Sequence, residues 1–193
     1  MAELREQDTD PDPLRQFDRW AAEGGADLMA LATATPEGAP SVRMVLLKQA
    51  GEAGLTFFTN YGSRKGLELA ANPRAALLFH WQELGRQVRV EGRVERLPAA
   101  ESDAYFASRP KGARLSATAS PQSEVVADRA ALEALVAQAR VRYGAEPPRP
   151  DTWGGFRLVP EEWEFWQHRE DRLHDRFAYL RDEGSWRIVR LQP

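Results

Sequence analysis

The sequence predicts an α+β protein, mainly β, in which a largely antiparallel sheet is flanked by helices. Five strand-like segments follow one another between residues 27 and 97, and turn-rich stretches such as PEGAP and QAGEAG separate them. These connections are too short for the crossover helices that parallel strands require. The close spacing of the five strands favours a barrel or a sandwich.

The first expected elements are an arm and a helix. Residues 1–11 are polar and charged, so we expect a flexible N-terminal arm. Pro13 suits the first turn of a helix, and Gly24 and Gly25 are placed to end it. The buried face of this helix is expected to be the apolar stripe of Leu14, Phe17, Trp20 and Ala21.

The remaining elements follow in order along the chain. Strands are expected at residues 27–35, 41–48, 54–60, 74–82 and 86–97, with a short helix from Ser63 to about Asn72 before the fourth strand. Longer helices are expected at 98–110 and 124–144. Strands return in the segments WGGFRLVP, EEWEFWQ, DRFAYLRD and GSWRIVRLQP. Since these late strands need partners, we expect one domain over residues 12–193, with residues from about 150 onward packed back on the early sheet.

Composition and missing motifs exclude several classes of protein. The chain of 193 residues has no cysteine, which excludes disulfides, thiolate metal sites and cysteine nucleophiles. Its formal net charge of −3 argues against a general polyanion binder. With no long apolar run and no signal-peptide pattern, we expect a cytoplasmic protein. The sequence lacks a P-loop, a G-x-S-x-G elbow and a G-x-G-x-x-G loop, and its histidines lack helical metal-ligand spacing, so no bound metal is expected.

Arg43 stands inside the apolar strand segment V-R-M-V-L-L-K, which ends at Lys48. A buried guanidinium cannot lose its proton, so Arg43 needs an anionic partner. That partner is either a protein carboxylate or a ligand, and a solvated sheet face is a third interpretation. In a regular strand Arg43 and Lys48 face opposite sides, so a shared pocket requires an irregularity in the strand or an extended site.

A second group of cations lies at the start of a predicted helix. Ser63 is a natural N-cap, and Arg64 and Lys65 follow it, where free backbone N–H groups already favour an anion. We expect either a bound phosphate monoester or a simply solvated first turn there. Tyr105 and Arg109 share a face near the end of another helix, and they either grip an anion together or form a surface pair.

The C-terminal segment D-R-L-H-D-R carries three cationic or protonatable groups. If the segment is extended, Arg172, His174 and Arg176 share one face, whereas Leu173 and Asp175 share the other. Either an anion lies over the basic face or the strand is exposed and charged. The aromatic cluster W-E-F-W at residues 163–166 is more typical of a core than of a platform for a planar ligand.

Eight motifs occur in one order along the chain: R-M-V-L-L-K, F-F-T-N-Y-G-S-R-K, R-Q-V-R-V-E-G, Y-F-A-S-R-P, P-Q-S, W-G-G-F-R, E-F-W-Q and R-L-H-D-R. That order resembles the pyridoxamine 5′-phosphate oxidase family, and the match covers residues 12–193. The resemblance implies an FMN-binding split β-barrel that works as a homodimer with active sites at the subunit interface. It also implies oxidation of pyridoxamine and pyridoxine 5′-phosphates to pyridoxal 5′-phosphate, with O2 as acceptor and H2O2 released.

The resemblance also assigns roles to residues at matching positions. Lys48, Tyr105 and Arg109 would hold the substrate phosphate. Arg172 and His174 would lie against the substrate ring as candidate catalytic residues, Arg172 as a lid and His174 to orient the substrate or move a proton. The FMN-binding residues would be Arg43, Met44, Val45, Leu46, Phe58, Thr59, Arg64, Lys65, Gln87, Gln122, Ser123, Trp166 and Arg176.

The chain departs from the family pattern at three places, all on the substrate side. Ala113 stands where relatives commonly carry a serine for the substrate phosphate, Thr118 replaces a usual tryptophan, and His168-Arg169 replaces a Gly-Gly pair. Two alternatives therefore stay open. One is a related FMN oxidase with another substrate, such as the phenazine-pathway type, and the other is a flavin- or pyridoxal-phosphate-binding protein without turnover.

Overall fold

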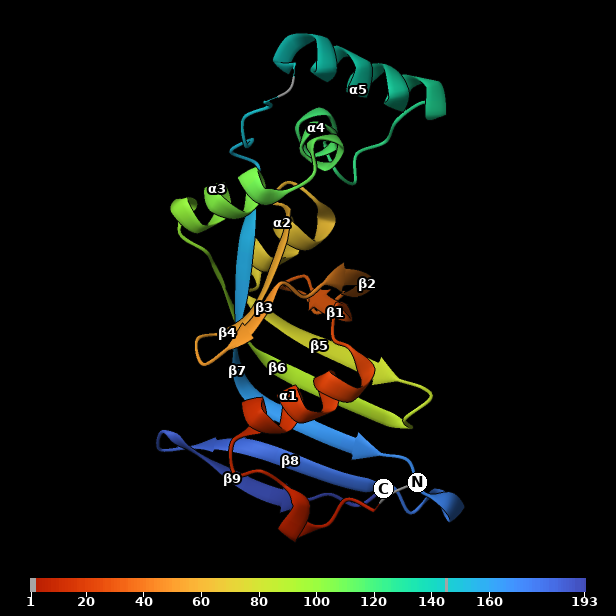
Figure 1. Ribbon diagram of the computed structural model, residues 1–193, viewed down its shortest axis with the longest axis vertical. Coiled ribbons are helices and arrows are strands. Elements are labelled where there is room, and N and C mark those ends of the chain that lie inside the picture. The colour runs from red at the N-terminus through yellow and green to blue at the C-terminus, as the bar shows by residue number, and fades with distance from the viewer. Residues whose placement is uncertain (1–2, 145) are drawn as a thin grey trace.

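The computed structural model describes residues 3–144 and 146–193, and its strands in this part of the chain form one curled antiparallel sheet (Figure 1). The strands are β1 (Leu28–Ala34), β2 (Pro40–Leu46), β3 (Gln49–Gly51), β4 (Gly54–Asn60), β5 (Arg74–Trp81), β6 (Arg86–Arg96), β7 (Trp153–Gln167), β8 (Asp175–Asp182) and β9 (Ser185–Arg190). Their order is β2-β1-β5-β6-β7-β4-β3, and β8 extends the sheet from β7 to β9. This arrangement confirms the predicted antiparallel α+β fold.

Side-chain caps fix where the first helices begin. The Asp12 carboxylate accepts a hydrogen bond from the Leu14 backbone N–H at 2.9 Å, and the Ser63 hydroxyl accepts one from Gly66. Both helices start where the sequence predicts. No described helix combines the length and the apolar character needed to cross a membrane. The helices are α1 (Pro13–Gly24), α2 (Arg64–Ala71), α3 (Ala99–Ser108), α4 (Lys111–Ala119) and α5 (Arg129–Tyr143), with short 3₁₀ turns η1 (Glu6–Asp8) and η2 (Glu170–Arg172).

The main core lies between α1 and the sheet (Figure 1). Phe17 and Trp20, from the predicted apolar stripe, are almost fully buried there. The Phe17 ring centroid lies 4.8 Å from that of Phe79, and the Trp20 centroid lies 5.3 Å from that of Phe165. Burial of each such side chain contributes about 1.5–3 kcal/mol, so these contacts hold α1 on the sheet.

Strand β7 is continuous although the sequence predicts two strands across the same residues. Opposite Glu91 and Gly92 of β6 the register shifts, so that Glu161 is an extra residue on β7. The core-facing positions consequently change from even numbers, as at Leu158, to odd numbers, as at Trp163. This change of phase interrupts the period-2 pattern that a single strand would show.

The bulge also requires a glycine on β6. A Cβ atom at Gly92 would overlap the backbone carbonyl of Val159. We therefore expect Gly92→Ala to lower the free energy of unfolding by about 1–3 kcal/mol, the usual cost of overpacking. Urea denaturation checks this, with Gly51→Ala as the control because no atom lies within 4 Å of the place that its new methyl group would occupy. Equal stability of both variants would show that the strands can separate at the bulge without cost.

Besides the two short 3₁₀ turns, one strand and one α-helix were not predicted from the sequence. β3 has only three residues and lies in the stretch interpreted as a turn. Helix α4 buries only Leu115, so its segment lacks the apolar stripe by which amphipathic helices are recognised. It packs on α5, and the pair projects from one end of the molecule (Figure 1).

The N-terminal residues make contacts that differ from the expectation of a flexible arm. Leu4 is buried, and its backbone N–H donates to the Asp175 carboxylate at 3.1 Å. Glu6 pairs with Arg190 at 2.7 Å. An apolar anchor and an ion pair thus place the described part of the arm beside β8 and β9.

Candidate functional site

A cavity of about 690 Å³ opens where the end of β2 meets β4, α2 and α3. Its lining comes from segments far apart in the chain, including the loop after α4 and the first residue of β7. Ten of the residues singled out from the sequence line it: Arg43, Met44, Val45, Leu46, Lys48, Phe58, Lys65, Tyr105, Arg109 and Gln122. Pro110, Ala113 and Trp153 complete the wall.

Arg43 and Lys48 line the same cavity in spite of their opposite parity. Strand β2 ends at Leu46, so Lys48 lies beyond the regular strand. The Lys48 backbone N–H donates to the carbonyl of Thr56 on β4 at 2.8 Å, which holds the turning chain against that strand. The end of the strand is therefore the irregularity that a shared pocket required.

One wall of the cavity is a stack of aromatic rings. The Phe58 centroid lies 4.0 Å from that of Tyr105 and 5.4 Å from that of Trp153, with nearly parallel planes. The Arg109 guanidinium lies over the Trp153 ring at 4.6 Å. Offset stacking and cation–π contact of this kind fix flat groups in place.

Arg109 has unused hydrogen-bonding capacity inside the cavity. Its Nη1 is buried and has no hydrogen-bond partner among the described residues. Burial lowers the pKa of the guanidinium, which nevertheless stays charged because arginine does not deprotonate in proteins. A buried donor without a partner is costly, and an anionic ligand would satisfy it.

Lys65 is the most deeply placed cation of the site. Only 8% of the residue is exposed, and its Nζ lies 3.2–3.3 Å from the oxygens of Thr59, Ser63 and Gln122. These partners are neutral, and no carboxylate of the described chain pairs with Lys65. Burial, and then repulsion from Arg43, lower the pKa of Lys65, whereas Glu68 acts to raise it. Lys65 is therefore not a solvated side chain in the first turn of α2, which was the alternative interpretation of this helix start.

Arg43 and Arg64 share a carboxylate that the sequence interpretation missed. Glu68, only 6% exposed, lies 3.3 Å from Arg43 Nη2 and 2.9 Å from Arg64 Nε. Arg43 thereby has the protein carboxylate that was one of its expected partners. The backbone N–H of Arg64 also donates to the Ser123 hydroxyl at 3.2 Å, which brings the predicted residue Ser123 to the same helix start. The spacing of Arg64 and Glu68, four residues apart on a helix, was the available signal.

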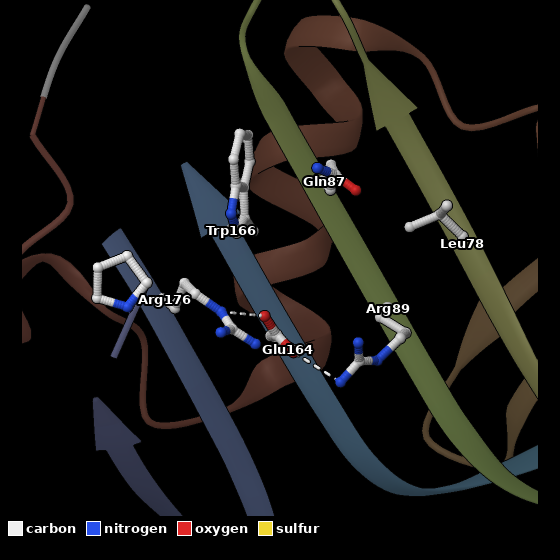
Figure 2. A pocket seen from close by; sticks show the side chains of 7 residues that line it. Leu78, Gln87, Arg89, Glu164, Trp166 and Arg176 are labelled. Carbon is white, nitrogen blue, oxygen red and sulfur yellow. Dashed lines mark hydrogen bonds and ion pairs between the residues drawn. The ribbon is translucent and has the colours of Figure 1, made fainter. Parts of the chain in front are cut away.

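Three predicted residues line a different, smaller hollow of about 250 Å³ (Figure 2). They are Gln87, Trp166 and Arg176. Figure 2 shows Glu164 between two guanidinium groups, with Arg176 Nε at 2.8 Å and Arg89 Nη2 at 2.7 Å. This hollow shares no lining residue with the larger cavity. One chain therefore presents the predicted cofactor residues in two separate places.

The predicted strand DRFAYLRD forms β8, but the extended conformation considered for the residues before it, which would place residues 172, 174 and 176 on one face, does not occur. β8 begins only at Asp175, and Arg172 belongs to η2 with a left-handed φ of 61°. Asp171, at φ 54°, has the same unusual conformation. An extended backbone is therefore interrupted before the strand starts. Arg172 is exposed, and Leu173, expected on the face of buried Asp175, is 69% exposed.

His174 lies beside the smaller hollow rather than in the larger cavity. Its Nδ1 accepts a hydrogen bond from the Arg169 backbone N–H at 3.1 Å. Its ring centroid lies 4.6 Å from that of Trp166 and 5.2 Å from that of His168. Trp163 and Phe165, by contrast, are core residues, as predicted for the W-E-F-W cluster, whereas Trp166 of the same cluster lines the smaller hollow.

Sequence reasoning also gave no role to Trp153. It stacks on the aromatic wall, and the W-G-G-F-R motif that contains it was the available signal. Within the described residues, no group of three or more histidine, cysteine, aspartate or glutamate side chains is placed to hold a metal ion.

Comparison with known families gives two matches that together span most of the chain. Residues 22–143 match the family described as pyridoxamine 5′-phosphate oxidase. Residues 153–193 match the pyridoxine 5′-phosphate oxidase C-terminal dimerisation region.

Individual relatives agree with these matches. The chain is 60% identical to a pyridoxine/pyridoxamine 5′-phosphate oxidase of Ralstonia nicotianae, over 96% of this chain and 91% of the relative. Among solved structures, PhzG of Burkholderia lata in complex with tetrahydrophenazine-1-carboxylic acid superposes with a TM-score of 0.92 at 35% identity, covering 99% of this chain and 98% of PhzG. A pyridoxamine 5′-phosphate oxidase-related, FMN-binding protein of Nostoc punctiforme shares the fold, with a TM-score of 0.76 at 18% identity over 96% of this chain and 100% of that chain.

Proposed function

The chain belongs to the pyridoxamine 5′-phosphate oxidase family, and we propose that it oxidises pyridoxamine and pyridoxine 5′-phosphates to pyridoxal 5′-phosphate with bound FMN, O2 as acceptor and H2O2 as by-product. The observation that carries this proposal is the larger cavity, where residues expected to bind cofactor and substrate meet. Two of its cations, Lys65 and Arg109, have neutral partners or an unused donor, as a site for phosphorylated ligands requires. We also propose that residues 12–193 act as one domain in the cytoplasm.

The residues present fit FMN, which combines a phosphate monoester with a flat ring. Lys65, buried among neutral oxygens, provides a charge for the phosphate, with Arg43 and Arg64 beside it. The bound flavin would accept a hydride from the substrate carbon and pass its electrons to O2. The holding residues of this cavity would be Arg43, Met44, Val45, Leu46, Phe58, Thr59, Arg64, Lys65, Gln122 and Ser123.

Lys48, Tyr105 and Arg109 bind the substrate phosphate in this proposal. Lys48 Nζ lies 5.9 Å from the centroid of the Tyr105 ring, and Arg109 offers its unpartnered Nη1 in the same cavity. A planar guanidinium matches two phosphate oxygens, whereas the ammonium acts as a point charge. Together they orient the substrate so that its reacting carbon faces the flavin.

A homodimer completes the site in this proposal. Gln87, Trp166 and Arg176 line a hollow separate from the cavity, so a second copy of the chain would bring them to it. Edge strand β2 supports this, since its residues Val42 and Met44 are 70% and 56% exposed beside the cavity. Exposed apolar patches of this kind typically mark protein interfaces. The C-terminal dimerisation region contains both Trp166 and Arg176.

Arg172 and His174 are proposed to act on the substrate rather than on the cofactor. The exposed Arg172 closes over the substrate, and His174, held by the Arg169 backbone, orients it or moves a proton. We expect alanine at either position to lower turnover at least about tenfold, the equivalent of one charge-assisted hydrogen bond, while FMN stays bound. Steady-state kinetics with a flavin absorbance spectrum measures both. His80→Ala, at an exposed histidine on β5, is the control, and normal turnover in both active-site variants would refute the assignment.

The direct test is aerobic turnover of pyridoxamine 5′-phosphate by the FMN-reconstituted protein, with aldehyde and peroxide followed together. Appearance of both in equal amounts supports the oxidase. Bound FMN with neither product would leave the cofactor proposal standing, and would favour another substrate or a protein that binds flavin without turnover.

A second function has one observation in its favour. Ala113 lines the cavity where the family commonly has a phosphate-binding serine, and PhzG is a close structural relative. Loss of that hydroxyl removes a hydrogen bond of about 1.5–3 kcal/mol to a charged phosphate. A phenazine-type oxidase would therefore oxidise tetrahydrophenazine-1-carboxylic acid and ignore pyridoxamine 5′-phosphate. Parallel assays with the two substrates separate the alternatives.

A further inference from the structure

Glu68 is a buried carboxylate at the centre of the cationic part of the site. It lies on α2, one turn after Arg64, and receives hydrogen bonds from Thr33 and Ser41 at 2.5 Å each. Arg43 and Arg64 approach it from β2 and from the helix start. Burial would raise the pKa of Glu68, but these hydroxyl and guanidinium partners outweigh burial and lower the pKa to about 2. The group is therefore a permanent anion at any physiological pH.

Protein contacts fix both guanidinium groups, and the two groups differ in the donors that remain available. Arg64 meets Glu68 through Nε, and no hydrogen bond from its terminal amino groups to another described residue is seen. Arg43 lines the cavity and donates Nη1 to the Leu31 carbonyl and Thr33, and Nη2 to Ser41 and Glu68, so that among its nitrogens only Nε has no such contact with a described residue. A side chain fixed before its ligand arrives loses less conformational entropy on binding.

The charge of this group matches one ligand class. The three cations Arg43, Arg64 and Lys65 with the single anion Glu68 leave a net charge of about +2. A phosphate monoester carries about −1.5 to −2 at neutral pH. Without Glu68 the half-buried Arg43 and the buried Lys65 would repel each other unopposed.

We propose that Glu68 is a positioning residue of the cofactor phosphate site, which holds Arg43 and Arg64 in place for the phosphate of FMN. This inference rests on the proposed function. Glu68 does not touch the ligand in this role, because its oxygens are occupied by side chains of β1, β2 and α2.

Glu68 has a second effect, on Lys65. The charged groups that face Lys65 are Arg43 on β2, which lowers its pKa, and Glu68 on α2, which raises it. Lys48, Tyr105 and Arg109 line the same cavity. Phosphate binding favours protonated Lys65. The affinity for FMN is therefore full at pH values below the pKa that Lys65 has in the ligand-free protein, and it falls as the pH rises above that pKa. Neutralising Glu68 moves this fall to lower pH.

The experiment titrates apoprotein with FMN and with riboflavin, which lacks the phosphate, and follows flavin fluorescence between about pH 6 and 9.5, a range chosen to approach the ordinary lysine pKa from below. For Glu68→Gln we expect the Kd of FMN to rise about tenfold at neutral pH, the equivalent of one charge-assisted contact. The Kd of riboflavin should stay unchanged, and the loss of FMN affinity should begin at lower pH than in the wild type. Glu133→Gln is the matched control, since Glu133 forms the same i,i+4 pair with Arg129 on α5, at 2.7 Å and away from the cavity.

Glu68→Asp keeps the charge and shortens the reach, so it should weaken FMN while leaving the pH of onset near that of the wild type. This variant also carries the test if the glutamine variant does not fold. Equal losses for FMN and riboflavin, unchanged FMN affinity, or tighter FMN binding in Glu68→Gln would each overturn the proposal. Failure of the wild type to bind FMN would instead overturn the proposed function itself.

Discussion

Replacement of Arg109 by leucine is expected to lower kcat/KM for pyridoxamine 5′-phosphate by about 10²–10³-fold, with FMN still bound. The buried Nη1 has no partner among the described residues, so its hydrogen bond is available to the substrate phosphate. Each hydrogen bond to a charged group contributes about 1.5–3 kcal/mol, and a guanidinium donates two to a phosphate. Leucine fills part of the volume, so the change removes these bonds without a large cavity.

Initial-rate kinetics over a range of substrate concentrations measures this effect. The kcat/KM of Arg109→Lys should lie between those of the wild type and Arg109→Leu. An ammonium keeps the charge but loses the planar fork and the stacking on Trp153. Arg157→Leu is the control, because Arg157 is similarly sheltered yet pairs with Glu95 and Glu101 outside the cavity. Full activity of Arg109→Leu would show that the substrate phosphate does not bind in this part of the cavity.

Replacement of Lys65 by methionine is expected to weaken FMN binding about a hundredfold. Methionine preserves the length of the side chain but removes an ammonium that is almost wholly desolvated among neutral oxygens. A charge-assisted bond to phosphate in such surroundings contributes about 3 kcal/mol. In the wild type, FMN affinity should also fall as pH rises through the lowered pKa of Lys65, below the ordinary value of 10.5. The methionine variant should lack this fall.

Equilibrium titration of apoprotein at several pH values tests both parts of the prediction. Lys111→Met, at an exposed lysine on α4, is the control for loss of one positive charge. An FMN affinity of Lys65→Met that equals the wild type would mean that the phosphate does not reach this ammonium.

Local signals predicted most elements, and failures occurred where tertiary contacts override them. Helices α1 and α2 carry capping side chains and apolar stripes within their own sequences, so their starts at Pro13 and Arg64 could be predicted. The bulge at Glu161 could not be predicted, because a register shift depends on how two strands pair and not on the sequence of one strand. Likewise, the sequence left open whether residues 172–174 are extended, and the structure has left-handed residues at Asp171 and Arg172.

Many of the residues that line the cavity could be singled out from the sequence, but the contacts between them could not. Arg43 needed an anion, and nothing within one strand could show that Glu68 on α2 supplies it. The distribution of the site over two places was also hidden, because parity and spacing describe a single chain. Gln87 and Arg176 line a separate hollow, and they would reach the cavity only in the dimer that we propose.

Strand β7 runs from the larger cavity to the smaller hollow. Trp153 lines the cavity at its first residue and Trp166 lines the smaller hollow near its last, roughly 40 Å apart along the strand at about 3.3 Å per residue. Loss of the codon for Glu161 would remove the bulge, and one half of the strand would then have to turn over. Either Trp153 or Trp166 would leave its hollow, along with the core residues of that half. In the proposed dimer the phase of the side chains along β7 would thus serve two active sites, which constrains the length of the strand more than that of the surrounding loops.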